Sequence, residues 1–140
     1  AGFRVVRRIG SGGMGQVYLA VQESLAREVA LKVLRPELAA DAAFVRRFEA
    51  EARAAAALGH PNVVTVYDVG QAPGGPEGAP LHYLAMEFMA RGSLEERLVR
   101  EGPMPARELL GALRDAARGL EYAELRGLVH RDLKPANLMS

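Results

Sequence analysis

The chain has 140 residues, which suits one ordinary domain, and a composition of 49% hydrophobic and 25% charged residues that is typical of a globular protein. A net charge of +1 gives no electrostatic reason to expect nucleic acid or an anionic membrane as a partner, and the lack of cysteine excludes disulfides and thiolate metal sites. No apolar run has the length of a membrane span, so we expect no membrane contact by this segment.

The first part of the chain is predicted to be rich in strands, because apolar and polar residues alternate along it. Five strands are expected near residues 3–9, 17–21, 29–34, 63–69 and 81–88. The first two flank a glycine-rich segment and should form a hairpin. A surface loop with no catalytic role is expected over 71–80, which is rich in Gly and Pro.

Capping signals predict three helices, over 41–58, from 93 onward, and over 105–126. Asp41 can cap the first helix and Gly59 can close it. Ser93 and Glu96 have the spacing of a capping box, and Gly127 can close the last helix. A strand-rich half followed by a helical half predicts an α+β fold.

The glycine-rich segment Gly10-Ser-Gly12-Gly-Met-Gly15 fits G-x-G-x-x-G. A dinucleotide-binding fold would begin a helix at the third glycine, whereas the residues after Gly15 alternate like a strand. The segment therefore predicts a hairpin whose bare backbone can approach phosphates closely. The alternative is an ordinary flexible hairpin.

Only two of the 18 basic residues are lysines, Lys32 and Lys134. A position that stays lysine in so arginine-rich a chain indicates a need for a compact ammonium group. The strand around Lys32 places it beside Ala30 on the inner face of a small sheet, where the ammonium needs an anion. Phosphates under the glycine loop would supply one.

A carboxylate partner for Lys32 is predicted from the first helix. One face of that helix is expected to carry Phe44, Phe48, Glu51, Ala55 and Leu58. Glu51 then lies on the apolar stripe, while Glu49 points away, so Glu51 should pair with Lys32. The alternative is that Glu51 sits at the edge of the stripe and meets an arginine.

The segment His130-Arg-Asp132-Leu-Lys134-Pro-Ala-Asn137 carries the strongest chemical signal. Its loop gathers a carboxylate that can accept a proton, a cation for a moving phosphoryl group, and an amide oxygen for a metal. We expect His130 to brace the loop rather than to transfer protons.

In this order and at these separations, the four motifs resemble those of the protein kinases. The segment His60-Pro61-Asn62-Val63 is similar to the turn that follows the regulatory helix in this family. A lysine two residues after the loop aspartate, as Lys134 is after Asp132, resembles the Ser/Thr-specific kinases rather than the tyrosine-specific ones. The phrases IGSGGMGQVYLA and HRDLKPANLM look most like bacterial eukaryotic-type Ser/Thr protein kinases. The resemblance implies a protein-kinase-like fold, with a five-stranded antiparallel N-lobe sheet and one regulatory helix, followed by the start of an incomplete helical C-lobe. It implies an N-lobe and hinge over 1–89 and the beginning of a C-lobe over 90–140.

The resemblance also implies roles for single residues. ATP would be bound by Ile9, Gly10, Ser11, Gly12, Gly13, Gly15, Val17, Ala30, Lys32, Met86, Glu87 and Met89. Lys32 would hold the α- and β-phosphates and pair with Glu51, Met86 would be the gatekeeper, and Glu87 and Met89 would bond adenine through backbone groups. Ser93 stands where many kinases place a ribose-binding carboxylate, so a ribose contact is not expected there.

The loop residues would complete the transfer chemistry. Asp132 would orient and deprotonate the substrate hydroxyl, Lys134 would steady the γ-phosphate, and Asn137 would bind Mg²⁺. Arg131 resembles the arginine that docks a phosphorylated activation loop. No aspartate in the chain is followed by Phe-Gly, so the principal Mg²⁺ ligand of the family is missing.

We therefore expect an ATP- and Mg²⁺-dependent kinase of protein Ser/Thr residues, with these 140 residues inactive alone. The expected location is cytoplasmic, either free or as the cytoplasmic domain of a membrane-anchored kinase. One alternative is a non-catalytic ATP-binding or scaffold protein. A more remote one is a small-molecule phosphotransferase, which Lys134-Pro135 disfavours.

Overall fold

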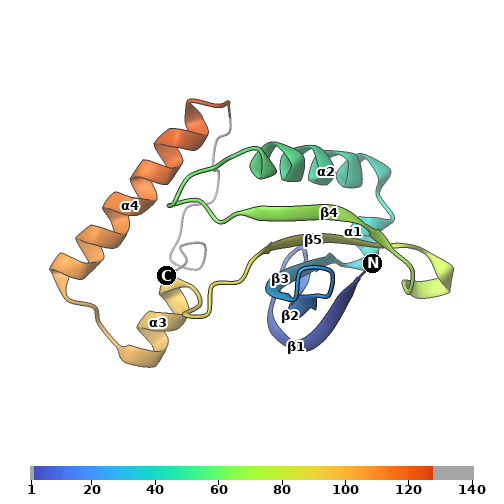
Figure 1. Cartoon of the computed structure of the whole chain (residues 1–140), viewed down its shortest axis with the longest axis horizontal. Coiled ribbons are helices and arrows are strands. Elements are labelled where there is room, and N and C mark those ends of the chain that lie inside the picture. The colour runs from blue at the N-terminus through green and yellow to red at the C-terminus, as the bar shows by residue number, and fades with distance from the viewer. Residues whose placement is uncertain (1, 128–140) are drawn as a thin grey trace. The chain divides into compact units, whose positions relative to one another are not determined.

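The structure is a computed structural model and describes residues 2–127 (Figure 1). It divides into two compact units. The first, which we call the sheet unit, consists of Ala1–Ala57 and Thr65–Phe88. The second, which we call the helical unit, consists of Leu58–Val64 and Met89–Ser140.

The sheet unit is built on a five-stranded sheet in the order β1-β2-β3-β5-β4, with all neighbouring strands antiparallel. Its elements are β1 (Phe3–Gly12), β2 (Gly15–Gln22), β3 (Arg27–Leu34), α1 (Pro36–Ala39), α2 (Ala42–Ala56), β4 (Val66–Ala72), the 3-10 turn η1 (Pro76–Gly78) and β5 (Leu81–Glu87). The α2 helix packs against β4. This arrangement confirms the predicted α+β class and the five-stranded antiparallel sheet.

One face of the sheet, which we call the Tyr83 face, carries the main apolar core. Its buried residues are Ala20, Val29, Leu31, Tyr83 and Ala85. The ring of Phe3 meets that of Tyr83 edge-on at 5.4 Å, and the Tyr83 hydroxyl donates to Asp68 Oδ2 at 3.1 Å. On the same face, the guanidinium of Arg27 lies 3.6 Å from the ring centre of Tyr67. A buried aromatic ring of this size contributes about 1.5–3 kcal/mol of apolar burial.

Two boundaries in the sheet unit differ from the prediction. β4 begins at Val66 rather than near Val63, because the Val63 amide donates to the His60 carbonyl at 3.1 Å and so belongs to a turn. The short helix α1 was not predicted at all. Its signal is Pro36 at the first helical position, where the missing N–H costs nothing and the fixed φ suits a helix.

The α2 helix begins as predicted and ends early. The Asp41 side chain accepts hydrogen bonds from the amides of Ala43 at 3.0 Å and Phe44 at 3.2 Å, which confirms it as the cap. At the other end the cap is Ala57, in a right-handed conformation, so the predicted closure by a left-handed Gly59 is wrong.

The helical unit contains α3 (Leu94–Glu101) and α4 (Ala106–Glu124). The predicted capping box is confirmed: the Ser93 hydroxyl accepts from the Glu96 amide at 3.1 Å, and the Glu96 carboxylate accepts from the Ser93 amide at 2.9 Å. Arg97 joins the two helices, because it binds Glu101 on α3 and Glu108 on α4. Gly127 follows α4 at φ 83°, as expected of a closing glycine.

The 58–64 segment is anchored on α4. The Gly59 amide donates to the Tyr122 hydroxyl at 3.3 Å, and the His60 and Tyr122 rings lie 4.8 Å apart. Gly119 is buried against the backbone of Asn62, so closely that an added Cβ would lie 2.5 Å from the Asn62 carbonyl oxygen. A glycine is therefore required at this helix contact.

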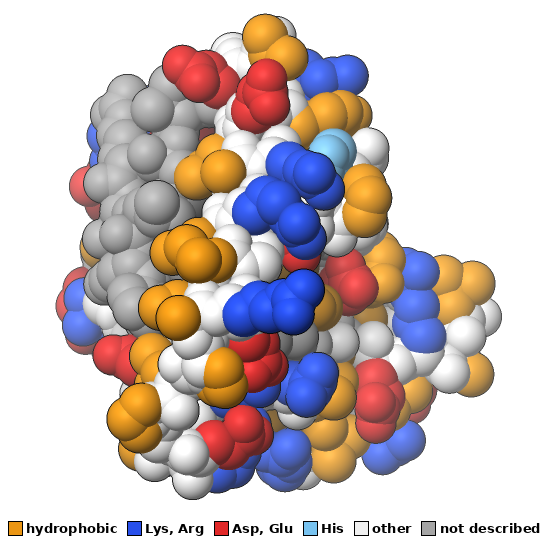
Figure 2. All heavy atoms as spheres, turned by 90° about the vertical axis from the view of Figure 1, so that its left-hand side faces the viewer, with side chains coloured by type: hydrophobic (Ala, Val, Ile, Leu, Met, Phe, Trp, Pro, Cys, Tyr) orange, Lys and Arg blue, Asp and Glu red, His pale blue; other side chains and the backbone are white. Residues whose placement is uncertain are grey.

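Much of the apolar surface of α4 is exposed. Leu110 and Leu113 are 66% and 44% exposed. Figure 2, which looks onto the side that carries α3 and α4, shows apolar side chains exposed between charged ones. Within residues 2–127, no helix combines the length and the apolar character needed to cross a bilayer.

Candidate functional site

The sheet register gathers several predicted site residues on the face opposite Tyr83, which we call the Lys32 face. Val17 on β2 pairs with Lys32 on β3, and Ala30 on β3 pairs with Met86 on β5. Directly paired residues of antiparallel strands point to the same face. Val17, Ala30, Lys32 and Met86 therefore share one face on three adjacent strands.

The glycine turn closes the β1–β2 hairpin next to this face. Gly12 pairs with Gly15, and a Cβ on Gly12 or Gly13 would meet nothing within 4 Å. Gly15 differs: it is buried at φ 153°, and a Cβ there would overlap the Val33 carbonyl oxygen. The turn thus has an open tip, where bare N–H groups can reach an anion, and a tightly packed base.

Gly10, Ser11 and Ile9, the other residues of the predicted phosphate-binding loop, do not all lie on the Lys32 face. Gly10 pairs with Val17 and lies on the Lys32 face. Ser11 pairs with Gln16, whose side chain is on the Tyr83 face, so only the backbone of Ser11 can serve the loop. Ile9 lies in a register irregularity between Arg8 and Gly10 and is half-buried.

Lys32 is a half-buried cation whose pKa is lowered by burial. No carboxylate among residues 2–127 lies within ion-pair distance of its ammonium group. A buried charge without a counter-ion is costly, and an anion placed beside it would remove that cost. The position is therefore suited to an anionic ligand.

Glu51 does not pair with Lys32 in this structure, and its predicted place on the buried stripe is wrong. The buried residues of α2 are Phe48 and Ala52, while Glu51 is exposed. Ala52 follows Glu51 by about 100° around the helix, which leaves Glu51 at the edge of the stripe. Glu49, expected to point away, is the less exposed of the two and pairs with Arg53 at 3.7 Å.

Some of the backbone groups of Glu87 and Met89, which were predicted to bind adenine, already form hydrogen bonds with other residues of the chain. The Glu87 amide donates to the Thr65 carbonyl at 2.8 Å, and the Glu87 carboxylate accepts from the Thr65 amide at 3.3 Å. What Glu87 can offer a ligand is therefore its carbonyl. The Met89 carbonyl accepts from the Gly92 amide at 2.9 Å, so Met89 can offer its amide.

The remaining predicted residues lie elsewhere. The Ser93 hydroxyl is used in the α3 cap. The catalytic candidates Asp132 and Lys134, the metal candidate Asn137 and the bracing His130 fall outside the described residues. Within residues 2–127 no three His, Asp or Glu side chains cluster as a metal site.

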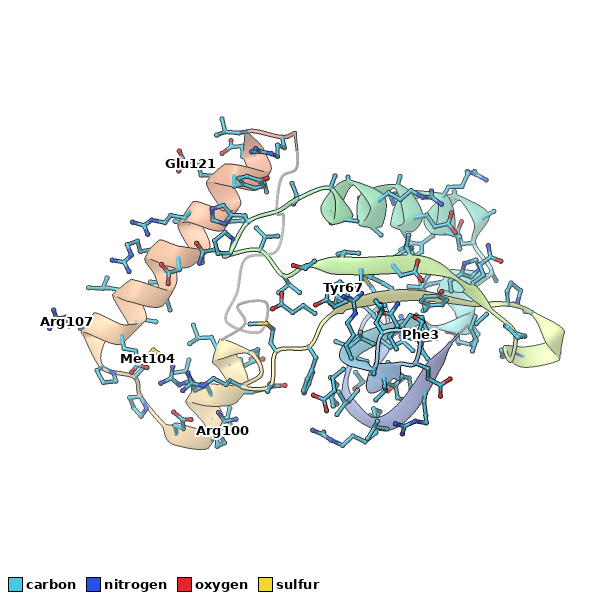
Figure 3. All side chains as sticks on the ribbon, viewed as in Figure 1. Phe3, Tyr67, Arg100, Met104, Arg107 and Glu121 are labelled. Carbon is cyan, nitrogen blue, oxygen red and sulfur yellow. The ribbon has the colours of Figure 1, made fainter. Side chains whose placement is uncertain are left out.

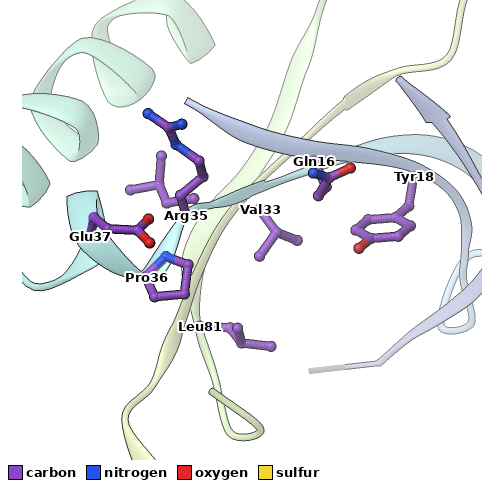
Figure 4. A pocket seen from close by; sticks show the side chains of 8 residues that line it. Gln16, Tyr18, Val33, Arg35, Pro36, Glu37 and Leu81 are labelled. Atoms are coloured by element: carbon purple, nitrogen blue, oxygen red, sulfur yellow. The ribbon is translucent and has the colours of Figure 1, made fainter. Parts of the chain in front are cut away.

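Two hollows on the sheet unit do not coincide with the Lys32 face. The larger, about 370 Å³, is lined by Gln16, Tyr18, Val33, Leu34, Arg35, Pro36, Glu37 and Leu81 (Figure 4). Its strand residues Tyr18 and Val33 are on the Tyr83 face. A second hollow of about 210 Å³ adjoins α1 and the 76–80 loop. Neither is lined by Lys32, so neither is the predicted nucleotide site.

Two supporting residues were missed in the sequence. Thr65 holds Glu87 from both sides, and the Arg35 amide donates to the Met14 carbonyl of the glycine turn at 2.9 Å. Thr65 and Arg35 contribute only backbone groups to these contacts, although the Glu87 carboxylate accepts one of the bonds. Residue patterns do not reveal such bonds, because any residue type can make them.

Comparison with known proteins gives a consistent result. Residues 3–140 match the family model described as "Protein kinase domain". The chain is 44% identical over 131 residues to the serine/threonine-protein kinase PknB of Mycobacterium leprae, which covers 94% of this chain and 21% of that protein. It is 43% identical over 137 residues to PknA of Mycobacterium tuberculosis, covering 98% of this chain and 32% of PknA.

Solved structures agree. The PknI kinase domain of Mycobacterium tuberculosis is 38% identical, with a TM-score of 0.80 over 98% of this chain and 54% of that one. The chain thus spans about half of a solved kinase domain and about a fifth of the length of PknB.

Proposed function

The chain belongs to the protein kinase family, and on that premise we propose that it carries the nucleotide-binding part of a serine/threonine protein kinase. The proposed reaction transfers the γ-phosphate of ATP to a hydroxyl group of a protein. Relatives that are named serine/threonine-protein kinases support this assignment. The observation that carries it is Lys32, a half-buried cation without a carboxylate partner in residues 2–127, beside an open glycine turn.

ATP fits the residues of the Lys32 face. Lys32 would hold the α- and β-phosphates, and the open amides at Gly12 and Gly13 would cover them. Val17 and Ala30 offer apolar side chains for the adenine ring, with Met86 behind it as gatekeeper. The Glu87 carbonyl and the Met89 amide provide the acceptor and donor that the adenine edge requires.

The transfer step is assigned to the loop after α4. The oxygen of the substrate hydroxyl would attack the γ-phosphorus while Asp132 accepts the hydroxyl proton. The bond between the γ-phosphorus and the β–γ bridging oxygen would break, and ADP would leave. Lys134 would steady the moving phosphoryl group. Asn137 would help to hold Mg²⁺, which supplies charge neutralisation of the phosphates.

The partner of this reaction is a protein that bears serine or threonine. Because ATP is a cytoplasmic metabolite, we place the reaction in the cytoplasm, whether or not the protein is also anchored to a membrane. The proposal does not depend on nucleic acid or on membrane contact by this segment.

The substitution Lys32→Met tests the nucleotide site. In the wild-type protein, Mg²⁺-ATP should raise the melting temperature by the linkage between binding and folding. In Lys32→Met that rise should disappear, and transfer of radiolabelled phosphate to a protein substrate by the full-length enzyme should be lost. Without nucleotide, the variant should melt slightly higher than the wild type, because a buried charge with a lowered pKa has been removed.

Arg35→Met is the matched control, since it removes an exposed cation from the residue that directly follows the same strand. It should keep the response to ATP. Persistent stabilisation of Lys32→Met by ATP would contradict the role of Lys32. Stabilisation of the wild type by ATP with no transfer by the full-length protein would favour the non-catalytic alternative.

A further inference from the structure

β1 is an edge strand of the sheet and carries an unusual density of positive charge. It lies at one end of the order β1-β2-β3-β5-β4, so only β2 pairs with it among the described strands. Arg4, Arg7 and Arg8 are all exposed. Between them, Val5 and Val6 are 52% and 49% exposed. An unpaired strand edge with exposed apolar side chains is a template for the addition of another strand.

The three charges are not neutralised within residues 2–127. None of Arg4, Arg7 and Arg8 makes an ion pair with a described carboxylate. Their cross-strand partners on β2 are Val21, Leu19 and Tyr18, none of which is a carboxylate. Arg8 donates one long hydrogen bond from its Nη1 to the uncharged amide oxygen of Gln16, Oε1, at 3.4 Å. The edge therefore presents a positive field along the strand.

A register shift decides how these arginines are arranged. The shift between Val5 and Arg7 places Arg7 opposite Leu19 while Arg4 lies opposite Val21, so both arginines share the Lys32 face. Arg8, opposite Tyr18, lies on the Tyr83 face. A flat anionic surface would approach one face at a time. An extended peptide along the edge alternates its side chains between both faces and can meet all three.

We propose that the free edge of β1 binds an extended acidic segment of another protein, which adds to the sheet as a further strand. Carboxylates or phosphates on alternate sides of that segment would pair with the arginines, and its apolar side chains would cover Val5 and Val6. Main-chain hydrogen bonds supply affinity in this mode and side chains supply specificity. A second copy of β1 does not fit, because like charges on paired strands repel each other.

The site lies outside the residues assigned to ATP, so it can be tested separately. The full chain is titrated, without nucleotide, into a fluorescent peptide that repeats Glu-Glu-Val-Val, so that glutamates lie on both faces of the added strand, and binding is followed by anisotropy. The glutamate peptide should bind, and its glutamine counterpart should bind at least about tenfold more weakly, as expected when charge-assisted pairs are lost. Added salt should weaken the binding. Hydrogen exchange should slow at β1 amides when the glutamate peptide is bound.

A triple variant, Arg4→Gln with Arg7→Gln and Arg8→Gln, should also bind about tenfold more weakly or worse. The control triple changes to glutamine three other exposed arginines that make no ion pair with a carboxylate of residues 2–127, namely Arg46, Arg107 and Arg118. Arg107 points away from α4 (Figure 3). This control has the same net charge as the first variant and should bind like the wild type.

Equal affinity of the two triple variants would overturn the proposal, as would equal affinity of the two peptides. Binding without protection of β1 amides would exclude strand addition. Preferential binding to phosphatidylserine vesicles, lost in the first triple variant, would assign the edge to a membrane instead. A normal response to ATP alongside any of these results leaves the proposed kinase function standing.

Discussion

The sheet unit and the helical unit differ in how they are held together. Among residues 2–127, almost all of the buried apolar residues lie in the sheet unit, and only Leu58 and Leu94 belong to the helical unit. In the helical unit, the His60 ring contacts the Tyr122 ring and Arg97 forms ion pairs with two glutamates. Leu110 and Leu113 of the same unit are exposed. The sheet unit carries a core of its own, whereas the described part of the helical unit is held by separate local contacts.

This difference bears on function. The residues assigned to ATP on the Lys32 face lie on strands whose other face is packed around Tyr83. A binding group on a packed sheet is held more rigidly than one on an isolated helix or loop. Substitutions in the two units should therefore have distinguishable effects on stability, and four tests, each with its own substitutions, examine this difference.

The largest effect is expected for Gly15→Ala. Its Cβ would overlap the Val33 carbonyl, and its φ of 153° is strained for any L side chain. We expect the free energy of unfolding to fall by about 3 kcal/mol or more, measured by urea denaturation. Gly13→Ala, where the added Cβ meets nothing within 4 Å, should change it by less than about 0.5 kcal/mol. Similar stability of the two variants would mean that the base of the turn is not packed.

A matched pair on α4 tests the helical unit, and the two signs should be opposite. Gly119→Ala should lower the free energy of unfolding by about 1–3 kcal/mol, because its Cβ would press on the Asn62 carbonyl. Gly111→Ala, in open space on the same helix, should raise it by about 0.5–1 kcal/mol. Helical circular dichroism during denaturation measures both. A higher free energy of unfolding in both variants would show that the 58–64 segment is not fixed to α4.

Tyr83→Phe should cost about 1 kcal/mol, the net value of a buried hydrogen bond. Burial raises the pKa of Tyr83, and the Asp68 carboxylate raises it further. A raised folded pKa gives stability that is complete below about pH 10 and is lost as the pH rises through the folded pKa. Denaturation midpoints across this alkaline range should fall more steeply for the wild type than for Tyr83→Phe. Parallel curves would contradict the assignment.

The smallest effect is expected at the surface of α2. Glu51→Gln should leave the stability of the nucleotide-free protein within about 0.5 kcal/mol of the wild type, since Glu51 is exposed. Glu49→Gln loses its ion pair with Arg53 and should cost about 0.3–0.5 kcal/mol. Thermal melts of the two variants measure the difference. A large loss in Glu51→Gln would indicate a buried pair that the structure does not contain.

Local signals in the sequence predicted much of the fold. Asp41, Ser93 and Glu96 acted as caps because their side chains reach backbone amides two or three residues away in the sequence. The alternation around Lys32 placed it correctly beside Ala30 on the face opposite Leu31. These features depend on neighbours close in sequence, which makes them readable without a structure.

Other features depend on contacts that the sequence does not encode locally. The position of Glu51 is set by which side of α2 packs on β4, and a spacing of three or four residues fits two adjacent stripes equally well. The start of β4 depends on the turn at His60, whose ring contacts that of Tyr122 far along the chain. The assignment of Asp132, Lys134 and Asn137 remains a prediction.

The Arg35 amide donates a hydrogen bond to the Met14 carbonyl of the glycine turn. It ties the hairpin tip to the segment that enters α1, so the hairpin cannot lift away from the sheet without releasing that single proton donor. The exchange rate of one backbone hydrogen, that of Arg35, should therefore record how often the tip opens. A nucleotide that holds the hairpin tip against the sheet would slow the exchange of the Arg35 amide hydrogen. A ligand that separates the tip from the sheet would accelerate it.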